Sequence, residues 1–126
     1  MKRIIKTKNA PNPVGPYNQA VMFNDMLFVS GQIPANPATG ELVKESIEAE
    51  ARQVMANIKA ILIEAGLDFS DIVKTSIFIT DMKNFAVVNG VYAEYFSSDF
   101  PARETIQVAA LPLGVNVEIS CIALKK

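Results

Sequence analysis

Two charged side chains are candidates for chemistry, because they lie in expected strands whereas most other charges lie on helix surfaces or in turns. Arg103 follows a proline in Phe100-Pro101-Ala102-Arg103 and opens an expected strand, while Glu118 stands in the middle of another, between Val117 and Ile119. An arginine at the end of a sheet can hold a carboxylate or phosphate through two parallel hydrogen bonds. The residues alone leave alternatives open. Arg103 can pair with a neighbouring carboxylate, and Glu118 can protect an edge strand or form a salt bridge between subunits.

Other polar positions carry weaker signals. Gly15-Pro16-Tyr17 predicts a rigid turn that presents an aromatic ring, and Asn89 can project polar groups from a helix. Packing for Tyr17 and simple surface exposure for Asn89 are the alternatives. Ser30-Gly31-Gln32 ends a strand, and Gly31 allows a ligand or another backbone to come close. No base accompanies Ser30, so we do not interpret it as a nucleophile.

The composition removes several kinds of catalytic site. The chain has 126 residues with no histidine and a single cysteine, Cys121. Without histidine there is no Ser-His-Asp triad, no Cys-His pair and no imidazole acid or base. The usual nitrogen and sulfur ligands of zinc are also missing, so we expect no metal. One cysteine forms no internal disulfide, and its apolar neighbours predict that Cys121 is buried and inert.

Charge and hydropathy indicate where the protein works. Twelve basic and thirteen acidic residues give a net charge of −1, which supplies no positive field for binding nucleic acid. Residues 1–6 are basic but lack the apolar run of a signal peptide, and no uncharged apolar stretch reaches the ~20 residues of a membrane helix. We therefore expect a soluble, cytoplasmic protein with neither a membrane nor a nucleic acid as partner.

The spacing of apolar residues predicts strands before residue 47 and a helix after it. Runs at residues 4–7, 20–23 and 27–30 are expected strands, and Asn24-Asp25-Met26 suits a tight hairpin turn. From residue 47 to 65 apolar residues recur every three or four positions, which is the helical period. Ser46 can cap this helix and Gly66 can end it, while Glu48 and Glu50 suit the positive end of its dipole. We expect such helix charges to be solvated.

The second half of the chain predicts a strand, a helix and two more strands. The first strand covers residues 72–80, Asp81 can cap the helix that follows, and the last strands are expected near residues 105–110 and 115–124. The order predicts one domain over residues 1–126 with an α+β fold, a single-layer mixed β-sheet with two helices on one face. Two helices cannot cover both faces of this sheet. The other face must be polar or buried by another subunit, and from its apolar residues we infer a homo-oligomer.

An ordered set of short motifs adds a resemblance to a known family. The motifs are Ala10-Pro11, Gly15-Pro16-Tyr17-Asn18-Gln19-Ala20, Ser30-Gly31-Gln32-Ile33-Pro34, Val73-Lys74-Thr75, Asn89 with Tyr92 and Phe96, Pro101-Ala102-Arg103, Leu111-Pro112, and Val117-Glu118-Ile119. With these motifs in this order, from about residue 10 to residue 123, the chain resembles the RidA/YjgF family of reactive-intermediate imine deaminases.

The resemblance implies a chorismate-mutase-like fold and a homotrimer assembled through its sheets, with clefts between subunits. It also implies a hydrolase, a 2-iminobutanoate/2-iminopropanoate deaminase. Such an enzyme converts enamine and imine intermediates released by pyridoxal-phosphate enzymes into 2-oxo acids and ammonia. The family uses no cofactor and no metal, so the implied partners are small 2-imino and 2-oxo acids.

The resemblance also assigns roles to residues. Arg103 corresponds to the arginine that binds the substrate carboxylate, beside the Gly31 N–H, and Glu118 corresponds to the glutamate that orients or activates water. The positions that correspond to pocket-lining residues are Tyr17, Ser30 and Asn89.

The chain departs from the family pattern after Arg103. Glu104 and Thr105 stand where a Ser or Thr followed by Cys is usual. Strand alternation directs Glu104 to the face opposite Thr105, so Glu104 need not neutralise Arg103. Thr105 keeps a polar atom in the binding site, and we expect water binding there to survive.

A second hypothesis gives the same intersubunit clefts a different use. In this hypothesis the protein is a non-catalytic regulator that binds 2-oxo acids. Such a sensor needs Arg103 but not a glutamate that activates water, so the presence of both Arg103 and Glu118 favours the enzyme.

Overall fold

The chain folds around one six-stranded sheet. The computed structural model describes residues 1–126. Its elements are β1 (Lys2–Ile5), β2 (Ala20–Phe23), β3 (Met26–Gln32), α1 (Ile47–Glu64), β4 (Ile72–Ile79), α2 (Phe85–Ala93), β5 (Ala102–Gln107) and β6 (Val117–Leu124). The strand order is β1-β2-β3-β6-β4-β5, with β4 and β5 parallel and every other pair antiparallel. The last strand of the chain therefore lies inside the sheet.

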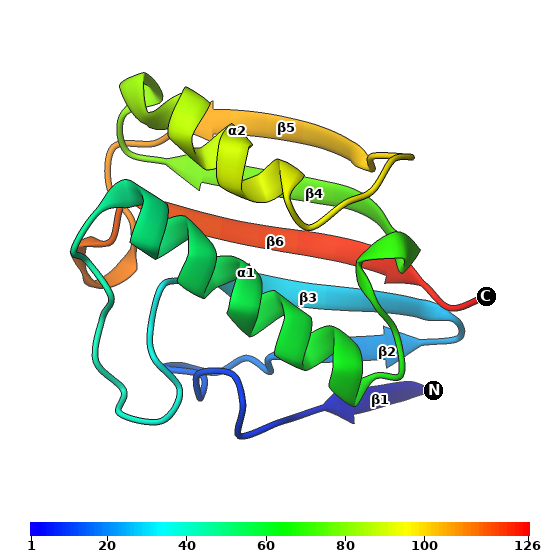
Figure 1. Cartoon of the computed structure of the whole chain (residues 1–126). Helices are drawn as coiled ribbons and strands as arrows, with labels where there is room; N and C mark the ends of the chain where they lie inside the picture. The colour runs from blue at the N-terminus through cyan, green and yellow to red at the C-terminus, as the bar shows by residue number, and fades with distance from the viewer.

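Both helices pack on the same face of the sheet. Helix α1 crosses β3 and β6, and α2 lies over β4 and β5 (Figure 1). Neither helix combines the length and the apolarity that crossing a bilayer requires. The arrangement confirms the predicted α+β class, a mixed single-layer sheet with two helices on one face.

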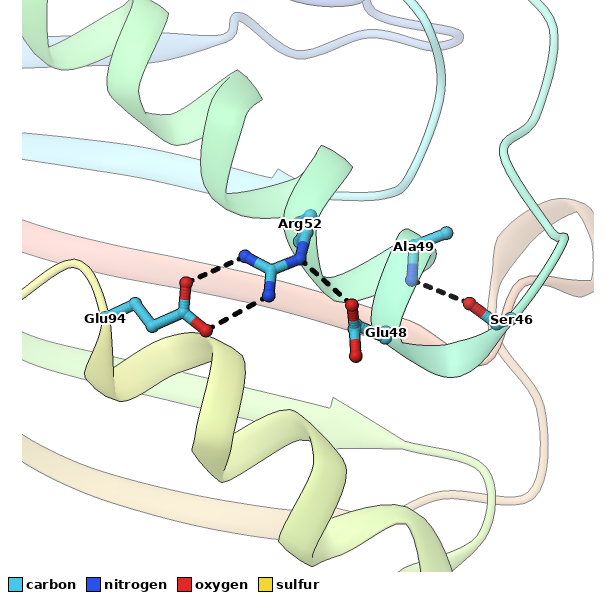
Figure 2. Close-up of polar contacts among 5 residues, drawn as sticks. All are labelled: Ser46, Glu48, Ala49, Arg52 and Glu94. Carbon is cyan, nitrogen blue, oxygen red and sulfur yellow. Dashed lines mark hydrogen bonds and ion pairs between the residues drawn. The ribbon is translucent and has the colours of Figure 1, made fainter.

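Helix α1 begins and ends where its sequence predicts. The Ser46 hydroxyl accepts a hydrogen bond from the Ala49 N–H at 3.0 Å, and Gly66 follows the helix with a left-handed φ of +79°. On the outer surface, Arg52 pairs with Glu48 one turn before it and with Glu94 at the end of α2 (Figure 2). The ion pair between Arg52 and Glu94, with 2.8 Å between Nη1 and Oε1, links the two helices on this surface.

One charge of α1 contradicts the expectation that helix charges are solvated. The Glu50 side chain is completely buried. Its two carboxyl oxygens accept hydrogen bonds from the Asn116 backbone N–H at 2.9 Å and from Asn116 Nδ2 at 2.7 Å. Glu50 therefore holds the loop that enters β6, a long-range role that its place in the first turn of a helix does not reveal.

Tertiary pairing shifts several predicted boundaries. Strand β1 starts at Lys2 and ends before Thr7, because the Thr7 N–H is bound by the Gln19 side chain and not by a strand. Strand β5 begins at Ala102 because it pairs with β4 from Lys74 onward. Asp81 caps a short 3-10 turn, residues 82–84, and α2 starts only after this turn. The hairpin turn is confirmed, with Asn24 in the left-handed region at φ 55°.

The face of the sheet without helices, here called the open face, remains largely apolar. Alternation along the strands puts Leu27, Val29, Ile77 and Ile119 in the core beneath the helices. The same alternation sends apolar side chains to the open face: Phe23, Met26, Phe28, Phe78, Ile106 and Leu124. The uncovered face is therefore as predicted. Its burial against another subunit stays a prediction.

Candidate functional site

Glu118 lies on the open face, on an interior strand. Its register partner on β4 is Phe78, and β6 is flanked by β3 and β4. The alternative that Glu118 protects an edge strand is therefore wrong. Its carboxyl group forms one wall of an open hollow of about 370 Å³ that Tyr17, Ser30, Gly31 and Pro112 also line. Four of the predicted site residues thus come together: Tyr17, Ser30, Gly31 and Glu118.

A bulge in β3 brings Gly31 against Glu118. Val29 pairs with Cys121 and Gln32 pairs with Ile119, so Ser30 and Gly31 together oppose a single residue of β6. Such bulges redirect a strand locally and often occur beside active sites. A Cβ atom on residue 31 would lie only 2.8 Å from Cδ of Glu118 and still closer to its Oε2. Glycine is therefore needed here for close approach and not for an unusual φ.

Surroundings determine what Glu118 can do chemically. Partial burial raises the pKa of the Glu118 carboxyl group above its ordinary value. No Lys or Arg of the chain forms a salt bridge with it. A carboxylate with a raised pKa, open to solvent on one side, is suited to accept a proton from a bound water.

The neighbours of Glu118 are already fixed by hydrogen bonds. The Ser30 hydroxyl donates to the Asn18 carbonyl oxygen at 2.6 Å, and the Ser30 N–H donates to the Gln19 carbonyl oxygen at 2.9 Å. The Tyr17 hydroxyl accepts a hydrogen bond from the Val14 N–H at 3.3 Å. Ser30 therefore lines the hollow with its hydroxyl proton bound to a backbone carbonyl oxygen.

Arg103 lies on the other face of the sheet, beneath α2. It pairs in register with Thr75, whose side chain is buried under the helix. The guanidinium carbon lies 5.0 Å from the centre of the Tyr92 ring and 5.7 Å from that of Phe85. None of the salt bridges of the chain includes Arg103. The alternative that Arg103 serves an ion pair within its own chain is therefore wrong.

Two more predicted residues accompany Arg103. Asn89 borders the open hollow of about 340 Å³ that Arg103, Tyr92 and Phe100 also line. Thr105 follows two positions along β5 on the same face, paired with Ile77. Its Oγ1 is buried and has no hydrogen-bond partner. Buried hydroxyl groups normally have a hydrogen-bond partner, which a ligand or a water can supply. The expected binding of water at Thr105 stays a prediction.

Glu104 does not approach Arg103, as its place in the strand predicts. Its side chain lies on the open face, where it accepts a hydrogen bond from the Ser76 hydroxyl and pairs with Lys74 at 3.0 Å. These two contacts lower the pKa of the Glu104 carboxyl group. Glu104 is therefore ionised at every pH at which an ordinary glutamate is ionised. The departure from the family pattern therefore leaves the charge of Arg103 free.

The predicted site is thus divided into two half-sites. Glu118 and Arg103 belong to opposite faces, and β4 separates their strands. Two strand spacings of about 4.8 Å and the thickness of the sheet lie between them. One small substrate cannot contact both side chains of a single chain.

Known proteins resemble this chain over nearly its whole length. The profile of the family described as Endoribonuclease L-PSP matches residues 7–125. A RutC family protein of Pyrococcus horikoshii is 49% identical over 126 residues, which are 100% of both chains. The structure of the Rid family protein YyfA of Yersinia pestis matches with a TM-score of 0.96 and 54% identity, over 98% of this chain and 99% of that one. The chain belongs to the RidA/YjgF family.

Other Rid family relatives carry information on ligands. The human protein named 2-iminobutanoate/2-iminopropanoate deaminase is 43% identical over 125 residues, which are 99% of this chain and 91% of that protein. E. coli TdcF, whose structure contains bound serine, matches with a TM-score of 0.94 and 43% identity over 98% of this chain and 99% of that one. The relatives confirm the family that the sequence motifs indicate. The solved structures confirm the fold that the family resemblance implies.

Some residues around the half-sites gave little signal in the sequence. Tyr92 belongs to the family motifs, yet its contact with Arg103 and its hydrogen bond with Thr75 depend on α2 crossing β4 and β5. Phe85 has the spacing of a core residue, and only its distance from Arg103 identifies it. No group of three or more Cys, Asp or Glu side chains has an arrangement that could hold a metal ion.

Proposed function

We propose that this Rid family chain is a deaminase that hydrolyses 2-imino acids, including 2-iminobutanoate and 2-iminopropanoate, to 2-oxo acids and ammonia. The observation that carries the proposal is the pair of half-sites. One holds an arginine without a carboxylate partner, and the other a glutamate with a raised pKa beside a glycine. The name of the human relative supports the substrate class.

The proposed reaction uses Arg103 as an anchor and Glu118 as a base. Two parallel hydrogen bonds from Arg103 bind the substrate carboxylate and contribute about 1.5–3 kcal/mol. Glu118 accepts a proton from water as the water oxygen bonds to the electrophilic carbon of the protonated imine. Glu118 then passes this proton to nitrogen, the C–N bond breaks and ammonia leaves. The new hydroxyl becomes the 2-oxo group as it gives its proton to Glu118, which releases it to solvent. Base catalysis of this kind contributes roughly 10²–10⁴-fold.

The proposed active site lies between subunits of a homotrimer. Because Arg103 and Glu118 are on opposite faces of one sheet, a complete site requires Arg103 from one copy and Glu118 from a second copy. The apolar open face, on which Glu118 lies, supplies a surface for that second copy.

The first experiment measures imine hydrolysis directly. A dehydratase generates 2-iminobutanoate from threonine, and semicarbazide traps the imine that remains. We expect the wild-type protein to accelerate the decay of the imine, Arg103→Ala to abolish this effect and Glu118→Gln to reduce it strongly. An unchanged decay rate with the wild-type protein would contradict the deaminase. Binding of 2-oxobutanoate without hydrolysis would support the regulatory alternative.

A second experiment tests whether the site is shared. Arg103→Ala and Glu118→Gln subunits are unfolded, mixed in equal amounts and refolded together. When the two variants assemble at random, about a quarter of all clefts combine an intact Arg103 with an intact Glu118, and activity returns in that proportion. If each site belonged to a single chain, the mixture would stay as inactive as its two components.

A further inference from the structure

The charge of Arg103 is held by aromatic rings. Its guanidinium carbon lies 5.0 Å from the Tyr92 ring centre and 5.7 Å from that of Phe85, and no carboxylate pairs with it. Both distances are within the ~6 Å range of a cation–π contact. An ion pair would neutralise the guanidinium and occupy its N–H groups, whereas a ring leaves the charge in place and the in-plane N–H groups free.

The Tyr92 side chain is held in place by a hydrogen bond and by packing against another ring. Its hydroxyl is 2.8 Å from Oγ1 of Thr75, in a buried hydrogen bond. Its ring packs on that of Phe96 with a centre-to-centre distance of 4.8 Å. Thr75 is also the register partner of Arg103 across β4 and β5. The same threonine therefore neighbours Arg103 through the sheet and holds the ring over which the guanidinium lies.

The Tyr92 hydroxyl remains uncharged in this place. Burial raises the pKa of Tyr92 above its ordinary value of about 10, so the phenol is neutral throughout the physiological range. A neutral ring supplies only its quadrupole to Arg103. This matches the requirements of an anion-binding arginine, which has to be oriented but must keep its charge.

We propose that Tyr92 is a positioning residue for Arg103: its ring, fixed by Thr75 and assisted by Phe85, orients the guanidinium to receive a substrate carboxylate. The proposal rests on the proposed function, in which Arg103 binds the substrate carboxylate. Tyr92 acts through Arg103 and needs no contact with the substrate. The outer ring, Phe85, is partly exposed and makes the longer contact, so its contribution is the smaller one.

The test reads the environment of Arg103 and its affinity separately. The Arg103 Nε–H resonance is assigned by its disappearance in Arg103→Lys, and its ring-current shift reports the stacked ring. The dissociation constant of 2-oxobutanoate is measured by calorimetry. The variants are Tyr92→Leu, which removes the ring, and Tyr92→Phe, which keeps the ring without the hydroxyl. Phe69→Leu is the matched control, since Phe69 packs in the same aromatic cluster through Tyr95 and Phe96 and does not contact Arg103.

Tyr92→Leu should remove most of the ring-current shift and weaken 2-oxobutanoate binding about tenfold. Tyr92→Phe should recover most of both quantities, and Phe69→Leu should change neither. If Tyr92→Leu does not fold, Phe85→Leu replaces it, because the substituted ring is partly exposed. This variant should move the Arg103 resonance and weaken binding about twofold to threefold. An Arg103 resonance and affinity that stay unchanged in the folded variants would overturn the proposal.

Failure of this proposal differs from failure of the proposed function. If the wild-type protein does not hydrolyse imines, the deaminase is contradicted; if the Tyr92 variants nevertheless change the Arg103 resonance and 2-oxobutanoate binding as expected, the role of Tyr92 is supported. Normal hydrolysis with an Arg103 resonance insensitive to Tyr92→Leu would contradict the positioning role alone.

Discussion

Glu118 and Arg103 are held by opposite kinds of surroundings. Burial favours the protonated form of Glu118 and so raises its pKa, whereas the rings beside Arg103 attract its positive charge without forming an ion pair with it. Neither side chain is neutralised within its own chain. In the proposed reaction, these two groups supply what a reactive imine requires of a protein without histidine.

The raised pKa of Glu118 predicts the acid limb of the pH–rate profile. A base must be ionised, so kcat/KM for 2-iminobutanoate should fall as the pH drops through the Glu118 pKa, which lies above the ~4.3 of an ordinary glutamate. Above that pKa the rate reaches its plateau. Steady-state rates across the pH range give the profile. In Glu118→Gln the residual rate should lack this break. A break that persists in this variant would assign the titration to another group or to the imine.

The close approach of Gly31 to the Glu118 side chain leads to a separate prediction. In Gly31→Ala the new methyl group displaces the Glu118 carboxyl group, because that group is a flexible side-chain end and the β3 backbone is not. We expect deaminase activity to fall at least tenfold while thermal unfolding changes little. Gly90→Ala is the control, since a Cβ at residue 90 meets nothing within 4 Å. Equal activity in the two variants would contradict the role of Gly31.

At the scale of elements, the entry to β6 is fixed from two directions. Glu50 of α1 binds both the backbone and the side chain of Asn116, and Lys44 donates a hydrogen bond to the Gly114 carbonyl oxygen at 3.0 Å. The loop from β5 to β6 carries both contacts and also Pro112, which borders the Glu118 hollow, and Leu113 at a left-handed φ of 58°. The start of α1 therefore supports one wall of a half-site that belongs to distant strands.

Removing the Glu50 carboxyl group should destabilise the fold. Glu50→Ala leaves partly buried Asn116 donors without their protein partner, which costs about 1–3 kcal/mol in free energy of unfolding. Glu50→Gln should cost less, because its amide oxygen still accepts one hydrogen bond. Urea unfolding measures both variants. Glu48→Ala, in the same helical turn but exposed, is the control and should stay within ~0.5 kcal/mol of wild type. A Glu50→Ala variant as stable as this control would contradict the role.

At the scale of the whole molecule, the two faces of the sheet differ in what covers them. The helices bury one face in the core, and the other exposes aromatic and aliphatic side chains around the polar contacts of Lys74, Ser76 and Glu104. Exposed apolar surface of this extent is typical of an interface. The Glu118 hollow opens on this face, so assembly and catalysis are expected to depend on the same surface.

A charge on the open face should therefore prevent assembly. Phe28, on β3, is 41% exposed there, and Phe28→Glu should give a monomer by light scattering at micromolar concentration together with loss of deaminase activity. Ile63→Glu is the control, because Ile63 is 62% exposed on α1, away from the open face. This variant should keep the wild-type mass and activity. A wild-type protein that is itself monomeric would contradict the shared site.

Local patterns in the sequence determined the elements whose cause is local. The period of α1, its Ser46 cap and its Gly66 end, the Asn24 turn and the alternation of β6 all arise from contacts within a few residues. The ordered family motifs identified the family and implied the roles expected of Arg103 and Glu118, which their residue types and positions had already singled out. The number of predicted helices, two for one sheet, was enough to predict that one face of the sheet is not covered by helices.

Only the tertiary structure decided which of these residues meet. The bulge that brings Gly31 to Glu118, the bond from Glu50 to Asn116 and the ring of Tyr92 over Arg103 each join segments far apart in the sequence. Strand pairing also put Arg103 and Glu118 on opposite faces, which no spacing along the chain expresses. The reason is physical: alternation fixes the face of a residue within its own strand, but only pairing with neighbouring strands fixes what that face lies against.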